Sequence, residues 1–209
     1  MMKPILFNTD MVRAILDGRK TVTRQVVNHK HLRGLENLSA EKIQRACVVP
    51  YRPGDILYVR ETWAKCQNAE SYVYKADFDG YAADVFLPLM KWRPSIHMPR
   101  EAARIWLRVT DVRVERLQEV TDREAEKEGI GDLFYEEIGF GNKDYGCVTY
   151  SDSKGVIGFQ KEQFAHLWDS TIKPKDRDKY GWAANPWVWV IAFERCSKPE
   201  EVHRCWNLQ

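Results

Sequence analysis

The chain has 209 residues, of which 44% are apolar and 30% charged, and its formal net charge is only +2. This length suffices for one domain with a buried core, and the composition excludes a disordered or membrane-spanning chain. The small net charge argues against a protein that binds long nucleic acid mainly by neutralising phosphates.

Cysteine and histidine spacing bears on metal sites and on the cellular compartment. The five cysteines are widely spaced without a C-x-x-C pair, and the close pairs His29/His31 and His203/Cys205 have no matching second pair. No apolar run reaches the roughly 18 residues of a membrane span, and residues 1–4 lack the apolar core of a signal peptide. We therefore expect a cytoplasmic protein with reduced thiols, no metal, no cofactor and no membrane partner.

The first predicted element is a short helix. Apolar residues recur at helical spacing over 11–16, Thr9 or Asp10 can cap the helix, and Gly18 can end it. β-branched residues at 21–27 then favour a strand. Lys20 therefore falls at a helix-to-strand junction.

The middle of the chain is less regular. Residues 28–50 are predicted to be a polar insertion with one short helix that starts near Ser39. A strand follows at 56–61. Prolines break residues 64–100 into short pieces, so we expect an elaborated loop region with one strand at Tyr72–Tyr74.

Clearer patterns follow. Residues 105–114 alternate apolar and charged side chains, which predicts a strand, and the alternation shifts after Val109, which indicates a bulge. The sequence T-D-R-E at 121–124 matches a capping box, and Gly129 can end the short helix that it starts. Glu128 is thus expected on the last helical turn.

The C-terminal part completes the pattern. Residues 131–155 are rich in Gly, Asp and Tyr and are predicted to form a loop that can cover a pocket. A packing helix is expected at 159–168 and a buried, wholly apolar strand at 187–193. Many short strands with few helices predict an α+β, barrel-like domain.

Four segments carry a resemblance to a known family. The sequence I-L-D-G-R-K-T-V-T-R at 15–24, followed by G-D-I-L-Y-V at 54–59, resembles the signature of the ASCH domain family. The segments 121–128 and 189–194 resemble the same family in the same order. The resemblance implies a PUA-like mixed β-barrel with flanking short helices.

We expect one such ASCH-like domain to span residues 1–209. Relative to the small members of the family it carries insertions at about 28–50, 64–100 and 131–185. These insertions leave the acyl and nucleoside preference open.

The family also implies an activity. Its small bacterial enzymes that hydrolyse N(4)-acetylcytidine use a Lys, a Thr three residues later and a Glu near the end of the later helix, and these positions match Lys20, Thr23 and Glu128. The resemblance therefore implies an amidohydrolase acting on a small nucleoside substrate. Other relatives are RNA-binding proteins or ribonucleases, so an RNA-binding module and a ribonuclease remain alternatives.

Two arrangements of these residues can hydrolyse an amide. In the first, the Thr23 hydroxyl attacks the acyl carbon, neutral Lys20 takes its proton and Glu128 orients the lysine or protonates the leaving amine. In the second, Glu128 activates a water while charged Lys20 and the Thr23 hydroxyl polarise the carbonyl. The resemblance favours the first arrangement. Residues three apart point to opposite faces of a regular strand, so Lys20 and Thr23 can converge only at an irregular junction.

Further side chains are candidates for substrate binding. Phe7 or Trp63 can stack on a base while Arg24, Arg60 or Glu61 meets its polar edge. The alternative is that both aromatics lie in the core and that Arg60 pairs with Glu61 at the surface. A cluster of cations in residues 13–33 predicts either a solvated face or an RNA contact; its members are Arg13, Arg19, Lys20, Arg24, Lys30 and Arg33.

Overall fold

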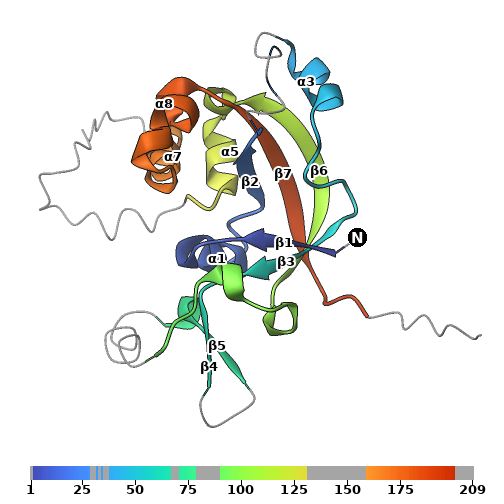
Figure 1. Cartoon of the computed structure of the whole chain (residues 1–209), viewed down its shortest axis with the longest axis vertical. Coiled ribbons are helices and arrows are strands. Elements are labelled where there is room, and N and C mark those ends of the chain that lie inside the picture. Colours follow the sequence, from blue (N-terminus) through green and yellow to red (C-terminus); the bar gives the residue numbers. More distant parts are fainter. Residues whose placement is uncertain are drawn as a thin grey trace, which may run out of the picture.

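The computed structural model describes residues 2–28, 32, 34, 38–66, 71–78, 90–130 and 159–200. They form a mixed five-stranded sheet with short helices around it, which confirms the predicted α+β class (Figure 1). In spatial order its strands are β1 (Met2–Leu6), β3 (Ile56–Arg60), β6 (Trp106–Arg116), β7 (Trp187–Cys196) and β2 (Val22–Val26).

The sheet is curved and open. β1 pairs in parallel with β3, and the other neighbouring strands are antiparallel. Figure 1 shows β6 and β7 as long arcs, with β1 and β2 at the two edges. Within the described part of the chain the expected barrel is therefore an open curved sheet, whose curvature brings the end of β1 near β2.

The central pair of strands follows the predicted patterns. The register of β6 on β7 shifts between Val109 and Asp111, which confirms the predicted bulge. β7 is apolar from Trp187 to Phe193, where it is buried on both faces, and then continues through the exposed charged residues Glu194 and Arg195. Trp189 and Ile191 belong to the core on one face, whereas Val188 and Val190 belong to the core on the other.

Five α-helices and six 3-10 turns surround the strands in the described residues. The α-helices are α1 (Thr9–Leu16), α3 (Ala40–Ala46), α5 (Asp122–Lys127), α7 (Phe159–Thr171) and α8 (Arg177–Tyr180). The 3-10 turns are Lys75–Asp77, Ser95–His97, Arg100–Ala102, Leu117–Glu119, Pro174–Asp176 and Trp182–Ala184. None of the described helices is long and apolar enough to span a membrane.

One helix start differs from the prediction. Asn8, not Thr9 or Asp10, is the N-cap of α1, and its side chain accepts a hydrogen bond from the Met11 N–H at 2.8 Å. Asn caps a helix as well as Asp does, so the sequence pattern did not separate the neighbouring positions.

The three predicted insertions are described only in part. The first contains α3, which begins after Ser39 as predicted and buries Ile43 against the main core. The second contains β5 (Tyr72–Tyr74), which is the predicted strand, and its antiparallel partner β4 (Trp63–Lys65). In the third, residues 131–158 lie outside the described residues, and with them the whole of the predicted 131–155 loop.

Candidate functional site

Lys20 is placed by the end of α1. Gly18 has a φ of 78°, a left-handed conformation that ends the helix, and the Lys20 N–H then bonds back to the Ala14 carbonyl at 2.9 Å. The next residue, Thr21, donates its N–H to the Lys127 carbonyl at 2.8 Å. The junction is therefore irregular, as predicted, and it faces the end of α5.

Glu128 is placed by α5. Thr121 and Glu124 form the predicted capping box at the start of this helix, and Gly129 follows its end with a φ of 91°. Glu128 faces Lys20 across an isolated antiparallel bridge, although 108 residues separate them in the sequence.

Lys20 and Glu128 form a buried ion pair. The Lys20 Nζ lies 2.5 Å from Glu128 Oε2, and the two side chains are 0% and 4% exposed. Nζ also donates to the Val22 carbonyl at 2.8 Å and to the Glu128 carbonyl at 3.0 Å. An ammonium group has three hydrogens, so these three acceptors use all of them.

The pKa of Lys20 is lowered from its ordinary value. Burial is the largest cause, because removing the ammonium group from water disfavours its charged form. Glu128 raises the pKa through its charge and its hydrogen bond, and the positive charge of Arg24 lowers it. Burial and Glu128 thus act on the pKa of Lys20 in opposite directions, and burial is the larger effect.

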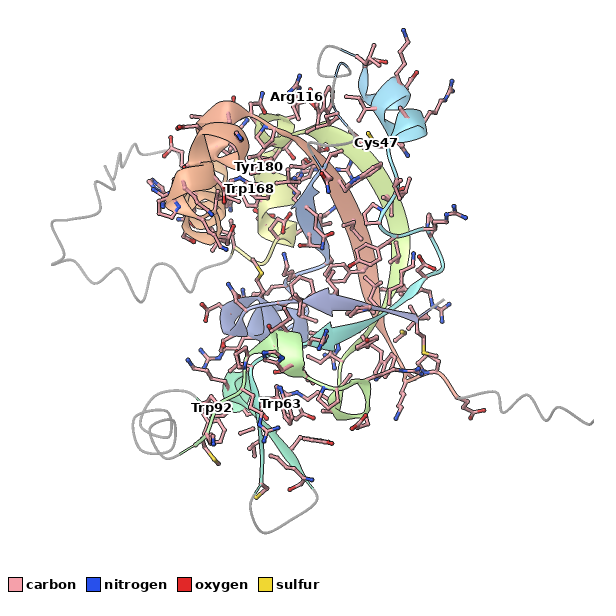
Figure 2. The ribbon with its side chains drawn as sticks, viewed as in Figure 1. Cys47, Trp63, Trp92, Arg116, Trp168 and Tyr180 are labelled. Carbon is pink, nitrogen blue, oxygen red and sulfur yellow. The ribbon has the colours of Figure 1, made fainter. Side chains whose placement is uncertain are left out.

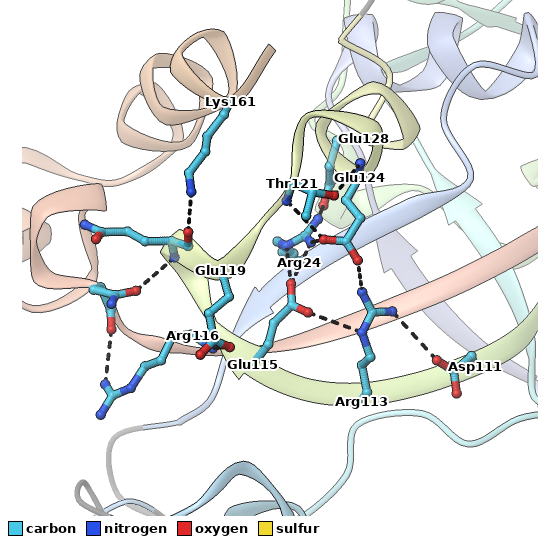
Figure 3. A network of polar contacts seen from close by, with 12 residues as sticks. Arg24, Asp111, Arg113, Glu115, Arg116, Glu119, Thr121, Glu124, Glu128 and Lys161 are labelled. Carbon is cyan, nitrogen blue, oxygen red and sulfur yellow. Dashed lines mark hydrogen bonds and ion pairs between the residues drawn. The ribbon is translucent and has the colours of Figure 1, made fainter. Parts of the chain in front are cut away.

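Arg24 is the second cation at Glu128. Its side chain is 0% exposed, and Nη1 donates to Glu128 Oε1 at 2.9 Å. Nε and Nη2 both donate to Glu115 Oε1, at 3.1 and 2.6 Å, and Nη2 also lies 3.3 Å from Glu124 Oε2 (Figure 3). The ring of Phe164 lies 5.5 Å from the guanidinium carbon. Each oxygen of the Glu128 carboxylate therefore binds one cation.

A pocket of about 270 Å³ opens beside Glu128. Thr23, Arg24 and Gln25 line it together with Glu128. Successive residues of a strand point to opposite faces of the sheet. Because β2 is an edge strand, residues on both of its faces can reach the pocket around its free edge. Thr23 is buried, and none of the described residues forms a hydrogen bond with its hydroxyl.

The pocket has apolar walls. Leu6 and Phe7, at and just after the end of β1, contribute one wall with Met11 of α1. The opposite wall comes from α7 and contains Phe164, Leu167 and Trp168. The lining is therefore mostly apolar on the β1–α1 and α7 sides, where Asn8 and Thr171 are its polar members, and mostly polar along β2 and at Glu128.

The structure brings five of the predicted residues together, namely Phe7, Lys20, Thr23, Arg24 and Glu128. Four of them line the pocket, whereas Lys20 lies behind Glu128 and outside the lining. No hydrogen bond joins Lys20 to Thr23. Lys20 does contact Phe7, whose ring centre lies 5.7 Å from Nζ.

Arg60 and Glu61, predicted as substrate contacts, do not line this pocket. Arg60 donates to the carbonyls of Ile96 and Met98, the latter at 2.8 Å. Glu61 is 1% exposed and pairs with Arg104 through both oxygens, at 2.9 and 3.0 Å, rather than with Arg60. β3, which leads into Glu61, is separated from β2 by β6 and β7.

Trp63 also lies away from the pocket. It is buried in a separate aromatic cluster with Met98 and Trp106, and the Arg93 guanidinium lies 5.1 Å from its ring centre. Figure 2 shows that Trp63, in β4, and Trp168, in α7, lie far apart in the molecule. Trp63 is therefore a core residue, which was the alternative to a role in substrate binding.

The basic cluster is largely engaged within the protein. Arg13 donates to the carbonyls of Ala76 and Phe78, and Arg19 donates to the Gly129 carbonyl and pairs with Asp17. The side chains of Lys20 and Arg24 are buried, as described above. Lys30 and Arg33 lie outside the described residues. The four described cations therefore form no free cationic face.

Some site residues were not predicted from the sequence. Phe164 and Trp168 were assigned to a packing helix, which is confirmed, but the same side chains line the pocket. Glu115 directly follows the strand expected at 105–114, and its position in the pattern indicates only an exposed charge. Nothing in the local pattern of either segment indicates a partner on β2.

Metal-ligating side chains do not gather in the described part of the chain. No group of three or more His, Cys, Asp or Glu side chains there could hold a metal ion. Cys47, Cys66 and Cys196 form no disulfide within the described part of the chain, and Cys147 and Cys205 lie outside it.

Comparisons with known proteins find only distant likeness. No family model matches the chain, and no curated protein matches it. A solved hypothetical protein is 13% identical with a TM-score of 0.37, covering 94% of this chain and 100% of its own. An ASCH domain from Lactobacillus crispatus JV V101 is 10% identical with a TM-score of 0.40, covering 93% of this chain and 79% of its own. A protein from Enterococcus faecalis V583 is 14% identical with a TM-score of 0.36, covering 88% of this chain and 65% of its own. Likenesses of this size do not establish a family.

Proposed function

We propose that the pocket between β2 and α7 is the active site of an amidohydrolase that removes an acyl group from N(4) of cytidine or a related nucleoside. One observation carries the proposal: Lys20 and Glu128 form a buried ion pair beside a pocket that Thr23 and Glu128 line. These are the three residues that the ASCH resemblance implies for this chemistry.

The shape of the pocket supports a small planar substrate. Apolar walls from Phe7 and from the Phe164–Trp168 segment can cover the faces of a base, while Thr23 and Glu128 offer polar groups in the same pocket. A volume of about 270 Å³ is near the lower end of the range for small-molecule sites, roughly 300 to 1,000 Å³. A single nucleoside is thus favoured over a polymer segment.

The hydrogen bonds favour Glu128 over Lys20 as the proton acceptor. All three Lys20 hydrogens are donated, and the lysine lies behind the carboxylate. Each Glu128 oxygen accepts from one cation and keeps a second lone pair. Glu128 can therefore accept a proton at the pocket while Lys20 and Arg24 hold it in place.

The reaction then proceeds by water attack. Glu128 takes a proton from a water whose oxygen bonds to the acyl carbon, and the Thr23 hydroxyl donates to the resulting oxyanion. The protonated Glu128 returns the proton to the N(4) leaving group as the C–N bond breaks. The products are the carboxylic acid and free cytidine.

Free cytidine release from N(4)-acetylcytidine tests the proposal. Glu128→Gln and Thr23→Val should each lower kcat by about a hundredfold or more, because each removes a group that acts in the transition state. Glu126→Gln removes an exposed carboxylate from the same helix and is expected to retain wild-type activity.

Two outcomes would contradict this function. Wild-type release by both site variants would place the chemistry elsewhere. Absence of turnover in the wild-type protein, together with salt-dependent binding or cleavage of single-stranded RNA, would support the RNA alternatives instead.

A further inference from the structure

Glu115, near the end of β6, lies outside the pocket but binds two arginines. Its side chain is 12% exposed. Oε1 accepts from both Nε and Nη2 of Arg24, at 3.1 and 2.6 Å, and Oε2 accepts from Nε of Arg113 at 3.2 Å (Figure 3). Arg113 in turn binds Glu124. Glu115 thus holds one edge of the buried Arg24 guanidinium.

The geometry of a guanidinium group makes this edge important. Its N–H groups lie in one rigid plane, so fixing the Nε–Nη2 edge also fixes the direction of Nη1. In Arg24, Nη1 is the atom that donates to Glu128 Oε1, at 2.9 Å. The ring of Phe164 lies against the same guanidinium. The direction of Nη1 therefore depends on Glu115.

The contact with Nη1 in turn limits the Glu128 carboxylate. Lys20 binds Oε2, and a single ion pair leaves the broad terminal torsion of a glutamate free to turn. The bond from Arg24 to Oε1 supplies the second fixed point. With both bonds, the carboxylate plane has one orientation beside the pocket.

We infer that Glu115 is a positioning residue for the proposed amidohydrolase, which aims the Arg24 Nη1 at Glu128 and so orients this carboxylate toward the substrate. The inference rests on the proposed function for its kinetic consequence. Its electrostatic consequence, which concerns the pKa of Lys20, is independent of the proposed function.

The electrostatic consequence follows from the charges around Lys20. Among the described residues, Glu128 and Arg24 are the charged groups that act on its pKa, in opposite directions. Glu115 and Glu124 offset the positive charge of Arg24, and this charge lowers the pKa of Lys20. Removing the negative charge of Glu115 should therefore make Lys20 lose its proton at lower pH.

The Glu115→Gln variant tests both consequences, with Asp111→Asn as the matched control. Asp111 is on the same strand, is 59% exposed and contacts Arg113 only at 3.8 Å, without touching Arg24. We would measure kcat and KM on N(4)-acetylcytidine. We would also titrate the ¹³Cε resonance of Lys20 by NMR, assigned with Lys20→Arg.

In Glu115→Gln, kcat should fall by up to about a hundredfold with little change in KM, because a misplaced carboxylate affects the chemical step. The Lys20 resonance should titrate at lower pH, and the control should show neither change. A wild-type kcat together with a wild-type Lys20 titration in Glu115→Gln would overturn the inference, as would a control that reproduces both changes.

Two further outcomes are separable. If the wild-type protein releases no cytidine, the proposed function fails and the kinetic consequence fails with it, whereas the Lys20 titration still decides the electrostatic consequence. If Glu115→Gln does not fold, Glu115→Asp replaces it: its shorter arm keeps the charge but withdraws the carboxylate from Arg24. This variant should lower kcat without moving the Lys20 titration, and a wild-type kcat would refute the positioning role.

Discussion

Gly129 directly follows Glu128 and packs closely against Ala14 of α1 and against Lys20. Its φ of 91° lies in the left-handed region, and a Cβ there would lie 2.7 Å from Ala14 Cβ and 3.0 Å from Lys20 Cβ. Gly54 has a similar φ of 87°, but nothing lies within 4 Å of its added Cβ. Both glycines therefore need the left-handed conformation, but only at Gly129 would an added Cβ also clash with its neighbours.

We predict that Gly129→Ala destabilises the protein more than Gly54→Ala does. Each should lose about 1–2 kcal/mol for its left-handed conformation. Gly129→Ala should lose a further 1–3 kcal/mol or so, because the methyl group displaces α1 or the Lys20 junction. Urea unfolding measures both values, and equal losses would show that the close approach is not costly.

Glu61 is a buried carboxylate outside the pocket. Burial raises its pKa above the ordinary value of 4.5, Arg104 acts to lower the pKa, and Asp77 raises it further. A carboxyl group with a raised folded-state pKa contributes stability that is fully present below its unfolded pKa. That contribution is lost as the pH rises through the folded pKa.

We predict that Glu61→Gln removes this loss. The free energy of unfolding of the wild type should fall relative to that of the variant as the pH rises above about 4.5, the ordinary pKa of the group. The fall should be about 1.4 kcal/mol for each pH unit by which the folded pKa exceeds the unfolded one. Urea unfolding at several pH values measures it, with exposed Glu101→Gln as the control. A difference that grows in the opposite direction would show that Arg104 outweighs the burial.

At the scale of elements, α5 carries most of the site's acidic groups. This six-residue helix supplies Glu124 to Arg24 and ends at Glu128, so its position sets two contacts of the buried network. An isolated helix of this length is not stable in water. Its capping box and the burial of Ala125 therefore matter more than they would in a long helix.

We predict that Thr121→Ala lowers the free energy of unfolding by about 1 kcal/mol, because it removes the acceptor for the Glu124 N–H. Ser39→Ala is the matched control, since Ser39 is the N-cap of α3 without a side-chain cap bond. It should cost less, and Thr121→Ser should restore most of the loss. If Ser39→Ala costs as much, the capping bond is not the cause.

At the scale of the whole molecule, one buried charge network joins elements that are distant in sequence. Arg24 of β2 binds Glu115 of β6 and both Glu124 and Glu128 at α5, and its guanidinium lies against Phe164 of α7. The network thus connects the sheet to the smaller core under α5 and α7. Removing its central cation would leave buried carboxylates without a partner.

We predict that Arg24→Met lowers the free energy of unfolding by about 3–5 kcal/mol, the usual cost of breaking a buried pair from one side. Arg108→Met is the control, because Arg108 and Glu194 are 4.0 Å apart and both more than half exposed. Its cost should stay below about 1 kcal/mol. Guanidinium unfolding compares them, and similar small losses would mean that the network is dispensable for folding.

Local signals in the sequence were sufficient for most elements. Helical spacing up to Gly18, the alternation with its shift after Val109 and the capping box at Thr121 all reappear in the structure. These features depend on contacts within a few residues, or on which side of an element is apolar. Local contacts and the position of the apolar side can both be recognised in a single stretch of sequence.

For the candidate site, the sequence by itself indicated Lys20, Thr23 and Glu128 through a motif and its order. Only the tertiary structure decided that Lys20 lies behind Glu128, that Glu115 holds Arg24 and that Arg60 lies elsewhere. The physical reason is that periodicity reports which residues face inward, whereas strand order and sheet curvature decide which inward faces meet. The order β1-β3-β6-β7-β2 separates β3 from β2, and the pocket forms where β2, the end of β1 and α7 meet.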